Sequence, residues 1–302
     1  MINKTIIFFH LQKSKKIVEY HVGGKNMPEL PEVETVKNVL KKNLIGLKIN
    51  NVDVFYPNMI KTNLEDFKNN LINEEFIDIK RLGKWLIFET SNYYLVSHLR
   101  MEGKYYYSDV FNHDKHEHVI FTLSNGYYLR YKDVRKFGVM FLVTKDNLYT
   151  DTPLSKIGLE PFDEELNSNY LLDKYRSKKL PIKTVLLDQE IISGLGNIYA
   201  DEVLFKSRIN PFKKANLIEK NECQEIIDNS RNILNDAIKL GGTTIRSYTS
   251  SLGVTGSYQD KLLVHTKKIC PVCGDKITVS KIRGRSTYYC KKCQSVTEVV
   301  NE

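Results

Sequence analysis

The sequence predicts an α+β fold: an N-terminal helix on an antiparallel β-sandwich, then a helical domain, then a C-terminal four-cysteine zinc ribbon. Three observations support this prediction. Apolar residues recur at helical spacing directly after Pro28 and again within residues 182–240. Short β-rich runs separated by turn pairs such as Asn125-Gly126 lie between these two regions. Four of the five cysteines fall within residues 270–293.

The first helix is predicted from its start signals and its apolar period. Pro31 suits a first helical turn, and acidic residues there match the positive end of the helix dipole. Gly46 provides the stop. The period is carried by Val33, Val36, Leu40 and Leu44. We therefore expect an amphipathic helix of about four turns.

The sandwich is predicted from seven β-rich runs and one intervening helix. Such runs, separated by turn residues, are typical of an antiparallel sandwich or barrel. The expected helix spans residues 64–71, and the expected strands span residues 52–56, 76–80, 85–90, 93–97, 119–123, 127–131 and 139–143.

Changes in pattern along the chain predict five segments. Residues 1–26 form an extension without clear periodicity, and residues 27–150 form the sandwich domain. Residues 151–180 are polar, contain proline and read as a linker with short helices. Residues 181–265 are the helical domain, with a long helix that ends at Gly241-Gly242, and residues 266–302 are the ribbon.

Composition favours an intracellular protein with a polyanionic partner. Lys and Arg outnumber Asp and Glu by 45 to 36, which gives a net charge of +9, although residues 1–26 alone carry +4. The longest early apolar run, at Ile6–Phe9, is far shorter than the roughly 20 residues of a membrane span. Clustered cysteines do not resemble the disulfide framework of a secreted domain. We expect a soluble intracellular protein without a membrane partner.

The cysteine spacing predicts a metal site. Cys270-x2-Cys273 and Cys290-x2-Cys293 are two knuckles separated by sixteen residues. Four thiolates satisfy tetrahedral Zn(II) and leave no position for water, so one structural zinc ion per chain is expected. Two redox dithiols are the alternative, which the paired knuckles disfavour. Cys223 stands apart and is expected to be a buried small residue.

Several motifs resemble the bacterial formamidopyrimidine-DNA glycosylase family, over about 275 of the 302 residues. The first is Met27-Pro28-Glu29-Leu30-Pro31-Glu32-Val33-Glu34. It is followed in order by Gly83-Lys84, His98-Leu99-Arg100-Met101-Glu102-Gly103, Tyr131-x-Asp133-x-Arg135-x-Phe137-Gly138, Gly194-Leu195-Gly196-Asn197-Ile198-Tyr199-Ala200-Asp201-Glu202 and the zinc ribbon. The resemblance implies a helix–two-turn–helix in the helical domain and DNA bound between the two halves.

The resemblance also implies the catalytic residues. Pro28 is expected to be the nucleophile, and Glu29 is expected to be the acid/base beside it. Lys84 is expected to contact the phosphate of the damaged nucleotide and to assist proton transfer. Arg285 matches the ribbon arginine that aids δ-elimination. A terminal amine suits this chemistry because, with a pKa near 8, about one-tenth of it is unprotonated at pH 7, against roughly one in 2,500 for a lysine. Without the resemblance, Pro28 would simply precede a helix.

Further residues are implied in lesion recognition and DNA binding. Met101, Arg135 and Phe137 match the residues that fill the gap left by a flipped base, and Glu32 is placed with them at the lesion. His116, Lys178, Lys183 and Asn197, with Arg135, match DNA contacts. The loop from Thr243 to Tyr258 is expected to close over the extruded base.

The first 26 residues depart from the family pattern. An amide nitrogen at Pro28 would not be nucleophilic, so we expect translation to start at Met27 and Met27 to be removed, or proteolysis to expose Pro28. The alternative is an inactive or DNA-binding protein.

The resulting hypothesis is a monomeric, nucleoid-associated glycosylase and AP lyase that excises oxidised purines from double-stranded DNA. Two alternatives remain. An endonuclease VIII-like enzyme for oxidised pyrimidines is disfavoured because those proteins usually open Pro-Glu-Gly-Pro. The alternative from a different class is a non-catalytic zinc-ribbon DNA-binding protein.

Overall fold

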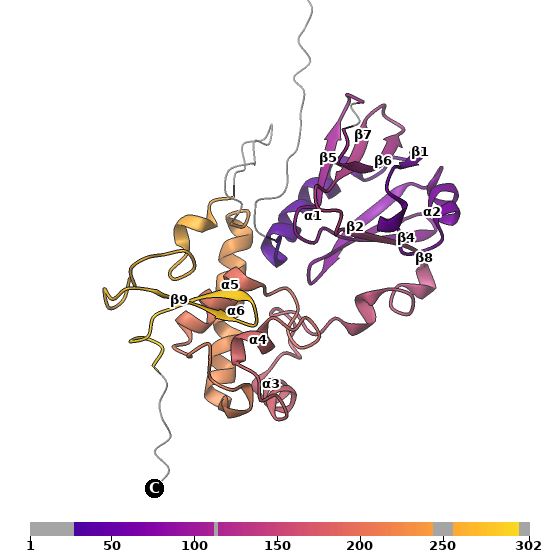
Figure 1. Cartoon of the computed structure of the whole chain (residues 1–302). Coiled ribbons are helices and arrows are strands. Elements are labelled where there is room, and N and C mark those ends of the chain that lie inside the picture. The colour runs from indigo at the N-terminus through magenta and orange to yellow at the C-terminus, as the bar shows by residue number, and fades with distance from the viewer. Residues whose placement is uncertain (1–26, 112–113, 244–255, 296–302) are drawn as a thin grey trace, which may run out of the picture.

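The computed structural model describes residues 27–111, 114–243 and 256–295. Its N-terminal part is a sandwich of two four-stranded antiparallel sheets, ordered β1-β6-β7-β5 and β2-β3-β4-β8 (Figure 1). Helix α1 (Leu30–Leu44) packs against β2. The remaining elements of this part are β1 (Ile49–Val54), α2 (Leu64–Leu71), β2 (Phe76–Leu82), β3 (Trp85–Thr90), β4 (Tyr93–His98), β5 (Lys104–Ser108), β6 (Glu117–Leu123), β7 (Tyr128–Lys132) and β8 (Val139–Thr144).

Strand β3 shows how both faces of a sandwich strand are covered. Its even positions Leu86 and Phe88 face the main core between the sheets. Its odd positions Trp85 and Ile87 belong to a second cluster with Leu154, which lies in the segment that follows the sandwich. Both faces of the strand are covered, so it has no polar face.

The predicted α+β fold and the antiparallel sandwich are confirmed, with one strand added. Strand β5 was not expected, because its sequence Lys-Tyr-Tyr-Tyr-Ser has no alternation of polar and apolar residues. Tyr105 and Tyr106 are both buried although they point to opposite faces of the sheet. Burial of adjacent tyrosines depends on covering on both sides, which a period-two pattern does not report.

The second part of the molecule is helical and contains α3 (Ser168–Tyr175), α4 (Ile182–Leu186), α5 (Asn197–Lys206) and α6 (Lys220–Lys239). Helix α6 ends just before Gly241-Gly242, as predicted, and its apolar face packs against α5 and α3. Cys223 is fully buried in this core. Among the described residues, no helix combines the length and the hydrophobicity that crossing a membrane requires.

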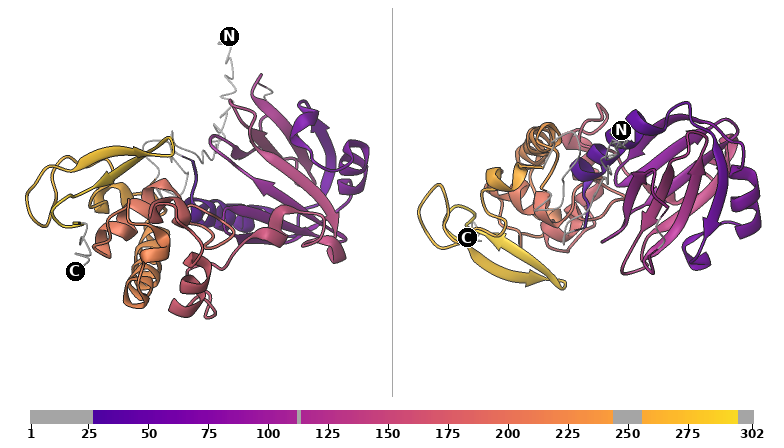
Figure 2. Two further views of the ribbon diagram at one scale, coloured as in Figure 1. Left: turned by 60° about the horizontal axis from the view of Figure 1, so that its bottom comes forward. Right: turned by 90° about the horizontal axis from the view of Figure 1, so that it is seen from above.

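Helix α1 belongs to both parts. Val33, Val36 and Leu40 pack in the sandwich core, whereas Leu30 packs in the helical core. The backbone N–H of Leu30 also donates to the carbonyl of Gly194, over 3.1 Å. The start of α1 is therefore held at the junction of the two parts, where the two views of Figure 2 place it.

The ribbon is a two-stranded hairpin, β9 (Thr278–Ile282) and β10 (Arg285–Tyr289), that packs on α5. Arg283 and Gly284 form its turn, both with positive φ. The turn places Arg285 opposite Ile282, at the first position of β10.

Candidate active site

The Glu29 carboxylate lies at the N-terminus of α5. It accepts hydrogen bonds from the backbone N–H groups of Gly196, Ile198 and Tyr199, at 2.7, 2.9 and 3.3 Å. The first N–H groups of a helix have no partner within the helix and carry the positive end of its dipole, so they favour a carboxylate. Gly196 is required here, because a Cβ at this position would clash with the Glu29 carboxyl group. Two segments far apart in sequence thus meet at Glu29.

Glu29 and Lys84 are buried side by side with opposite pKa shifts. Both side chains are at least 90% shielded from solvent. Burial raises the pKa of Glu29, and the charge of Lys84 partly opposes this shift. Burial lowers the pKa of Lys84, with Glu29 opposing and Arg285 adding to the shift. The Lys84 ammonium donates to the carbonyl of Leu195 at 2.8 Å. The site therefore holds a carboxyl group that keeps its proton more readily than usual and a lysine that loses its proton more readily.

An ion-pair cluster fixes the turn that carries Lys84. Glu160, from the segment between the two parts, accepts from the backbone N–H of Gly83 at 2.6 Å and pairs with Arg81. Arg81 donates to the Gly83 carbonyl at 2.8 Å and to Glu34 of α1 at 2.9 Å. Both backbone polar groups of Gly83 are thus engaged.

Glu32 ties α1 to the start of the expected lesion loop. Its carboxylate accepts from the backbone N–H of Thr243 at 2.7 Å and from the Tyr199 hydroxyl at 2.8 Å. It also accepts from the backbone N–H of Glu29 at 3.0 Å. The expected loop itself falls mainly on residues 244–255, which lie outside the described residues.

Met101, Arg135 and Phe137 come together on the surface of the sandwich. The Arg135 guanidinium donates to the Met101 sulfur at 2.9 Å and lies over the Phe137 ring, 4.7 Å from its centroid. The buried Asp133 carboxylate accepts from the backbone N–H groups of Arg135 and Phe137 and so shapes their loop. Phe137 is 49% exposed. A large exposed aromatic ring on a braced loop has the form of a wedge.

The predicted DNA-contacting residues have different surroundings. Arg285 is exposed at the start of β10, and Asn197 donates from its side chain to the carbonyl of Ser286 at 3.0 Å. Lys178 is partly exposed, with its ammonium 3.9 Å from Asp188. His116 lies in the sandwich part, half-buried, and its backbone N–H donates to Asp114.

Lys183 is more enclosed than the other predicted DNA-contacting residues. Its side chain is 0% exposed, and its ammonium forms an ion pair with the buried Asp201 at 2.7 Å. Its expected contact with a phosphate stays a prediction, and its contacts in this structure are with the protein. The sequence did not indicate this, because a lysine early in a short helix is usually solvated.

His98 is a site residue that the sequence analysis did not single out. Its Nδ1 accepts from the backbone N–H of Arg100 at 2.9 Å, so a neutral ring carries its proton on Nε2. Burial, with the nearby charges of Arg100 and Lys84, lowers the pKa of His98 to about 3. A neutral imidazole N–H is thus available beside Lys84 as a donor. The signal was its place three residues before Met101.

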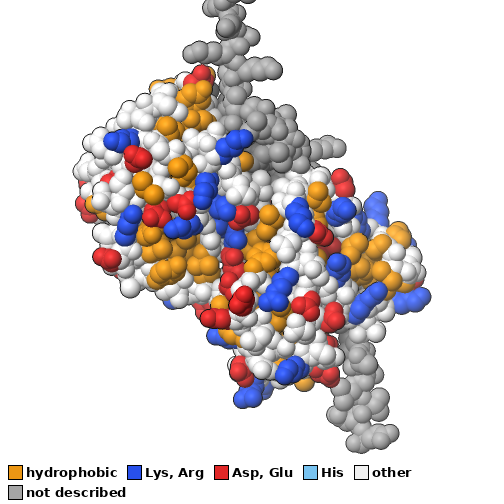
Figure 3. Space-filling view, turned by 180° about the vertical axis from the view of Figure 1, so that it is seen from behind, with side chains coloured by type: hydrophobic (Ala, Val, Ile, Leu, Met, Phe, Trp, Pro, Cys, Tyr) orange, Lys and Arg blue, Asp and Glu red, His pale blue; other side chains and the backbone are white. Residues whose placement is uncertain are grey.

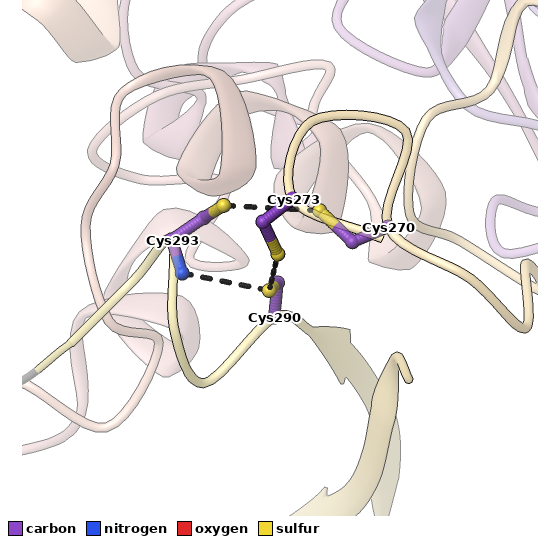
Figure 4. Close-up of side chains that lie close together, drawn as sticks. All are labelled: Cys270, Cys273, Cys290 and Cys293. Atoms are coloured by element: carbon purple, nitrogen blue, oxygen red, sulfur yellow. Dashed lines mark hydrogen bonds between the residues drawn. The ribbon is translucent and has the colours of Figure 1, made fainter. Parts of the chain in front are cut away.

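The four cysteines of the ribbon fit a tetrahedral metal site. Their sulfur atoms all lie within 4.8 Å of one another (Figure 4). The pairs Cys270–Cys293 and Cys273–Cys290 are 3.8 and 3.5 Å apart. Four thiolates at about 2.3 Å from one Zn(II) would be about 3.8 Å apart, so the cluster fits zinc with side-chain shifts of about 1 Å or less. Such a site is structural, since no coordination position stays open.

Comparison with known proteins covers the chain from residue 27 almost to its end. Family models match residues 27–140 (formamidopyrimidine-DNA glycosylase N-terminal domain), 157–249 (formamidopyrimidine-DNA glycosylase H2TH domain) and 268–296 (zinc finger found in FPG and IleRS). The last match bears out the predicted zinc site.

Similar whole proteins give the same result. Formamidopyrimidine-DNA glycosylases of Oceanobacillus iheyensis and Lactobacillus helveticus are each 44% identical, over 89% of this chain and 98% and 99% of their own length. Among solved structures, Lactococcus lactis Fpg in complex with abasic-site DNA is 40% identical, with a TM-score of 0.83 over 89% of this chain and all of that chain. The same Fpg bound to N7-benzyl-Fapy-dG DNA superimposes equally well. The chain therefore belongs to the formamidopyrimidine-DNA glycosylase family.

Proposed function

We propose that this protein is a bifunctional DNA glycosylase and AP lyase of base excision repair that removes oxidised purines, such as 8-oxoguanine and formamidopyrimidines. One observation carries the proposal. The carboxyl group of Glu29, adjacent to Pro28 in sequence, is buried against α5 beside Lys84, with pKa shifts that suit acid/base chemistry. Within this family, that arrangement matches a nucleophile with its proton-transfer partners.

The reaction assigns each group a defined step. The Pro28 nitrogen forms a bond to the sugar C1′, the bond from C1′ to the base breaks, and Glu29 supplies the proton that opens the sugar ring. The resulting iminium is positively charged and acidifies the C2′ hydrogen. Loss of that proton breaks the C3′–O bond, and the 3′ phosphate leaves with the bonding electron pair. In a second elimination, assigned to Arg285, loss of the C4′ hydrogen breaks the C5′–O bond, and the 5′ phosphate leaves in the same way. Lys84 holds a phosphate and assists proton transfer.

Further residues are proposed to recognise the lesion and to bind the DNA. Met101, Arg135 and Phe137 would fill the space left by the extruded base, and their contact in one exposed group supports this. Glu32 would help hold the loop that begins at Thr243. Lys178, Asn197 and His116 remain candidate phosphate contacts. Zinc would hold the ribbon rigid and take no part in the reaction.

The proposal requires that Pro28 begin the active polypeptide. The nitrogen of an internal proline is an amide without nucleophilicity, whereas a terminal proline is a secondary amine. That the family match starts at residue 27 supports a start at Met27 followed by its removal. We further propose the five segments expected from sequence, with boundaries at residues 26, 150, 180 and 265, and a monomer that acts on nucleoid DNA in the bacterial cytosol.

Covalent trapping tests the proposal. The protein starting at Pro28 and the chain starting at Met1 are each incubated with duplex DNA containing 8-oxoguanine, in the presence of borohydride. We expect a reduced adduct only with the first form, and peptide mapping should assign it to Pro28. An adduct at another residue, or equal activity of the form with residues 1–27 attached, would refute the mechanism.

Two further measurements separate the alternatives. Faster excision of thymine glycol than of 8-oxoguanine would favour the endonuclease VIII-like activity. Lesion DNA bound without any adduct would favour the binding protein. Mass spectrometry of the intact native protein reports whether residues 1–27 are present.

A further inference from the structure

Lys183 is a buried cation whose contacts lead to the ribbon. Its Nζ donates to the carbonyl of Ser286 at 2.9 Å and to the Thr287 hydroxyl at 3.0 Å, in addition to its ion pair with Asp201. Two hydrogens of the ammonium group are donated to β10, and the Asp201 carboxylate of α5 lies beside it as an ion-pair partner. Lys183 is therefore engaged by α5 and β10 inside the protein.

Thr287 passes this contact on to Arg285. The Thr287 side chain is 0% exposed, and its hydroxyl accepts from Lys183 and donates to the backbone carbonyl of Arg285 at 3.2 Å. A hydroxyl can accept and donate at once, so the three groups form one chain of hydrogen bonds. The chain ends on the backbone of the arginine that the proposed mechanism uses.

Asp201 fixes the same strand from the other side. Its second carboxylate oxygen accepts from the backbone N–H of Tyr288 at 3.2 Å and bonds Nδ1 of His265 at 2.8 Å. The His265 ring packs on Tyr288, with centroids 4.7 Å apart. Side chains of α4, α5 and the segment before the first zinc knuckle therefore bind residues 286–288 of β10 by hydrogen bonds and ring packing.

We propose that Lys183 and Asp201 are positioning residues that set the register of β10 on α5, and that Lys183 places Arg285 in the active site through Thr287. The assignment rests on the proposed function, because it uses the role of Arg285 in δ-elimination. It replaces a direct phosphate contact by Lys183 with an indirect effect on one elimination step.

The ratio of δ- to β-elimination products from end-labelled lesion DNA tests the assignment in the zinc-loaded, active protein. We expect Lys183→Met to lower this ratio about as far as Arg285→Ala does, while β-elimination and the trapped adduct persist. The double variant should match Arg285→Ala within about twofold, because both changes act on one group. Lys206→Met, which removes an exposed lysine of α5, should leave the ratio unchanged.

The salt dependence of DNA affinity distinguishes this assignment from a direct contact between Lys183 and a phosphate. If Lys183 neutralised a phosphate, adding Lys183→Met to Arg285→Ala would reduce the log–log slope of DNA affinity against salt by roughly a further 0.9. That result, or an unchanged product ratio in Lys183→Met with bound zinc, overturns the assignment.

A milder pair of variants covers the case in which Lys183→Met does not fold. Thr287→Val keeps the shape but removes the hydroxyl, and Thr287→Ser keeps the hydroxyl. We expect the valine variant to lower the δ to β ratio and the serine variant to retain it. Equal ratios in the two overturn the proposal. A parent protein that forms the Pro28 adduct but no δ product overturns the role of Arg285, and no adduct at all refutes the proposed function itself.

Discussion

At the scale of single residues, the active site is built by placing charges where water is excluded. Glu29 accepts three backbone hydrogen bonds at the α5 N-terminus, which favours its charged form, yet burial outweighs them and raises its pKa. Lys84 meets the same burial and shifts in the opposite direction. Because the two pKa values move toward each other, proton transfer costs less free energy than between the same two groups in water, which suits general acid/base catalysis.

The raised pKa of Glu29 predicts how stability depends on pH. Below the unfolded value of about 4.5 the group is protonated in both states, and its contribution to stability is fully present. As pH rises through the folded-state pKa, the buried carboxylate must ionise and this contribution is lost. Glu29→Gln stays neutral, so its free energy of unfolding relative to the parent should increase as pH rises above 4.5. Urea unfolding between pH 4 and pH 8 measures this difference.

That comparison uses the chain starting at Met1, in which the Pro28 nitrogen is uncharged and cannot influence Glu29. Glu164→Gln replaces an exposed carboxylate and serves as the control for the change from Glu to Gln. A parent that gains stability over Glu29→Gln with rising pH would contradict the assigned direction.

Phe137 makes a second prediction at this scale. Its ring is half exposed, so Phe137→Ala should change the free energy of unfolding by less than about 1 kcal/mol. Excision of 8-oxoguanine from a fully paired duplex should slow by about tenfold or more, because the opened base stack then loses its aromatic wedge. The loss should shrink when the lesion lies in a mismatch, which is easier to open. Single-turnover kinetics on both substrates check this, and an equal loss on the two would contradict the wedge role.

At the scale of elements, the period of apolar residues in the sequence predicted the helices and strands that bury one face. The α2 helix matches its expected bounds, residues 64–71, and the amphipathic α6 ends just before Gly241-Gly242, as expected. Strand β5 was not predicted, because Tyr105 and Tyr106 are buried on opposite faces of the sheet. A polar–apolar period indicates an element with one buried face. Burial of the second face depends on segments that are distant in sequence, so the local pattern does not indicate it.

The site residues show the same division. Motifs indicated Glu29, Lys84 and the group of Met101, Arg135 and Phe137, since each lies in a short local pattern. The burial of Lys183 depends on Asp201 and on the ribbon about 100 residues later. Such pairings arise only when the elements pack, so a lysine that binds DNA and one that braces a strand look the same in sequence.

The ribbon supplies a prediction for one whole element. Its core is small, consisting of the cysteines with Phe205, Val264 and Ile277, so metal binding contributes much of its folding energy. Cys290→Ser should abolish zinc binding, unfold the ribbon and reduce DNA affinity by at least about tenfold. The sandwich should keep its own unfolding transition, since its core is separate. Zinc analysis and DNA titration measure the first effects, and full lesion cleavage without zinc would show the ribbon to be dispensable.

At the scale of the whole molecule, basic side chains outnumber acidic ones. The chain carries a net charge of +9. On the face seen in Figure 3, basic and acidic side chains are interspersed, so this face presents no field of a single sign. The two parts are linked by the partly buried ion pair of Arg81 with Glu160 and by the buried hydrogen bond of Glu32 with Thr243. The halves that would enclose DNA are thus joined by polar contacts beside the catalytic groups.

The final prediction concerns DNA binding by the molecule as a whole. If DNA binds mainly through phosphates, the logarithm of its affinity should fall linearly with the logarithm of salt concentration, by about 0.9 for each phosphate neutralised. Six or more contacts would lower affinity by about a thousandfold or more between 50 and 200 mM salt. Arg285→Ala should reduce the slope by about one, whereas Lys206→Met should not change it. Fluorescence anisotropy with uncleavable abasic-site DNA measures the slopes, and an affinity independent of salt would exclude a phosphate-lined binding surface.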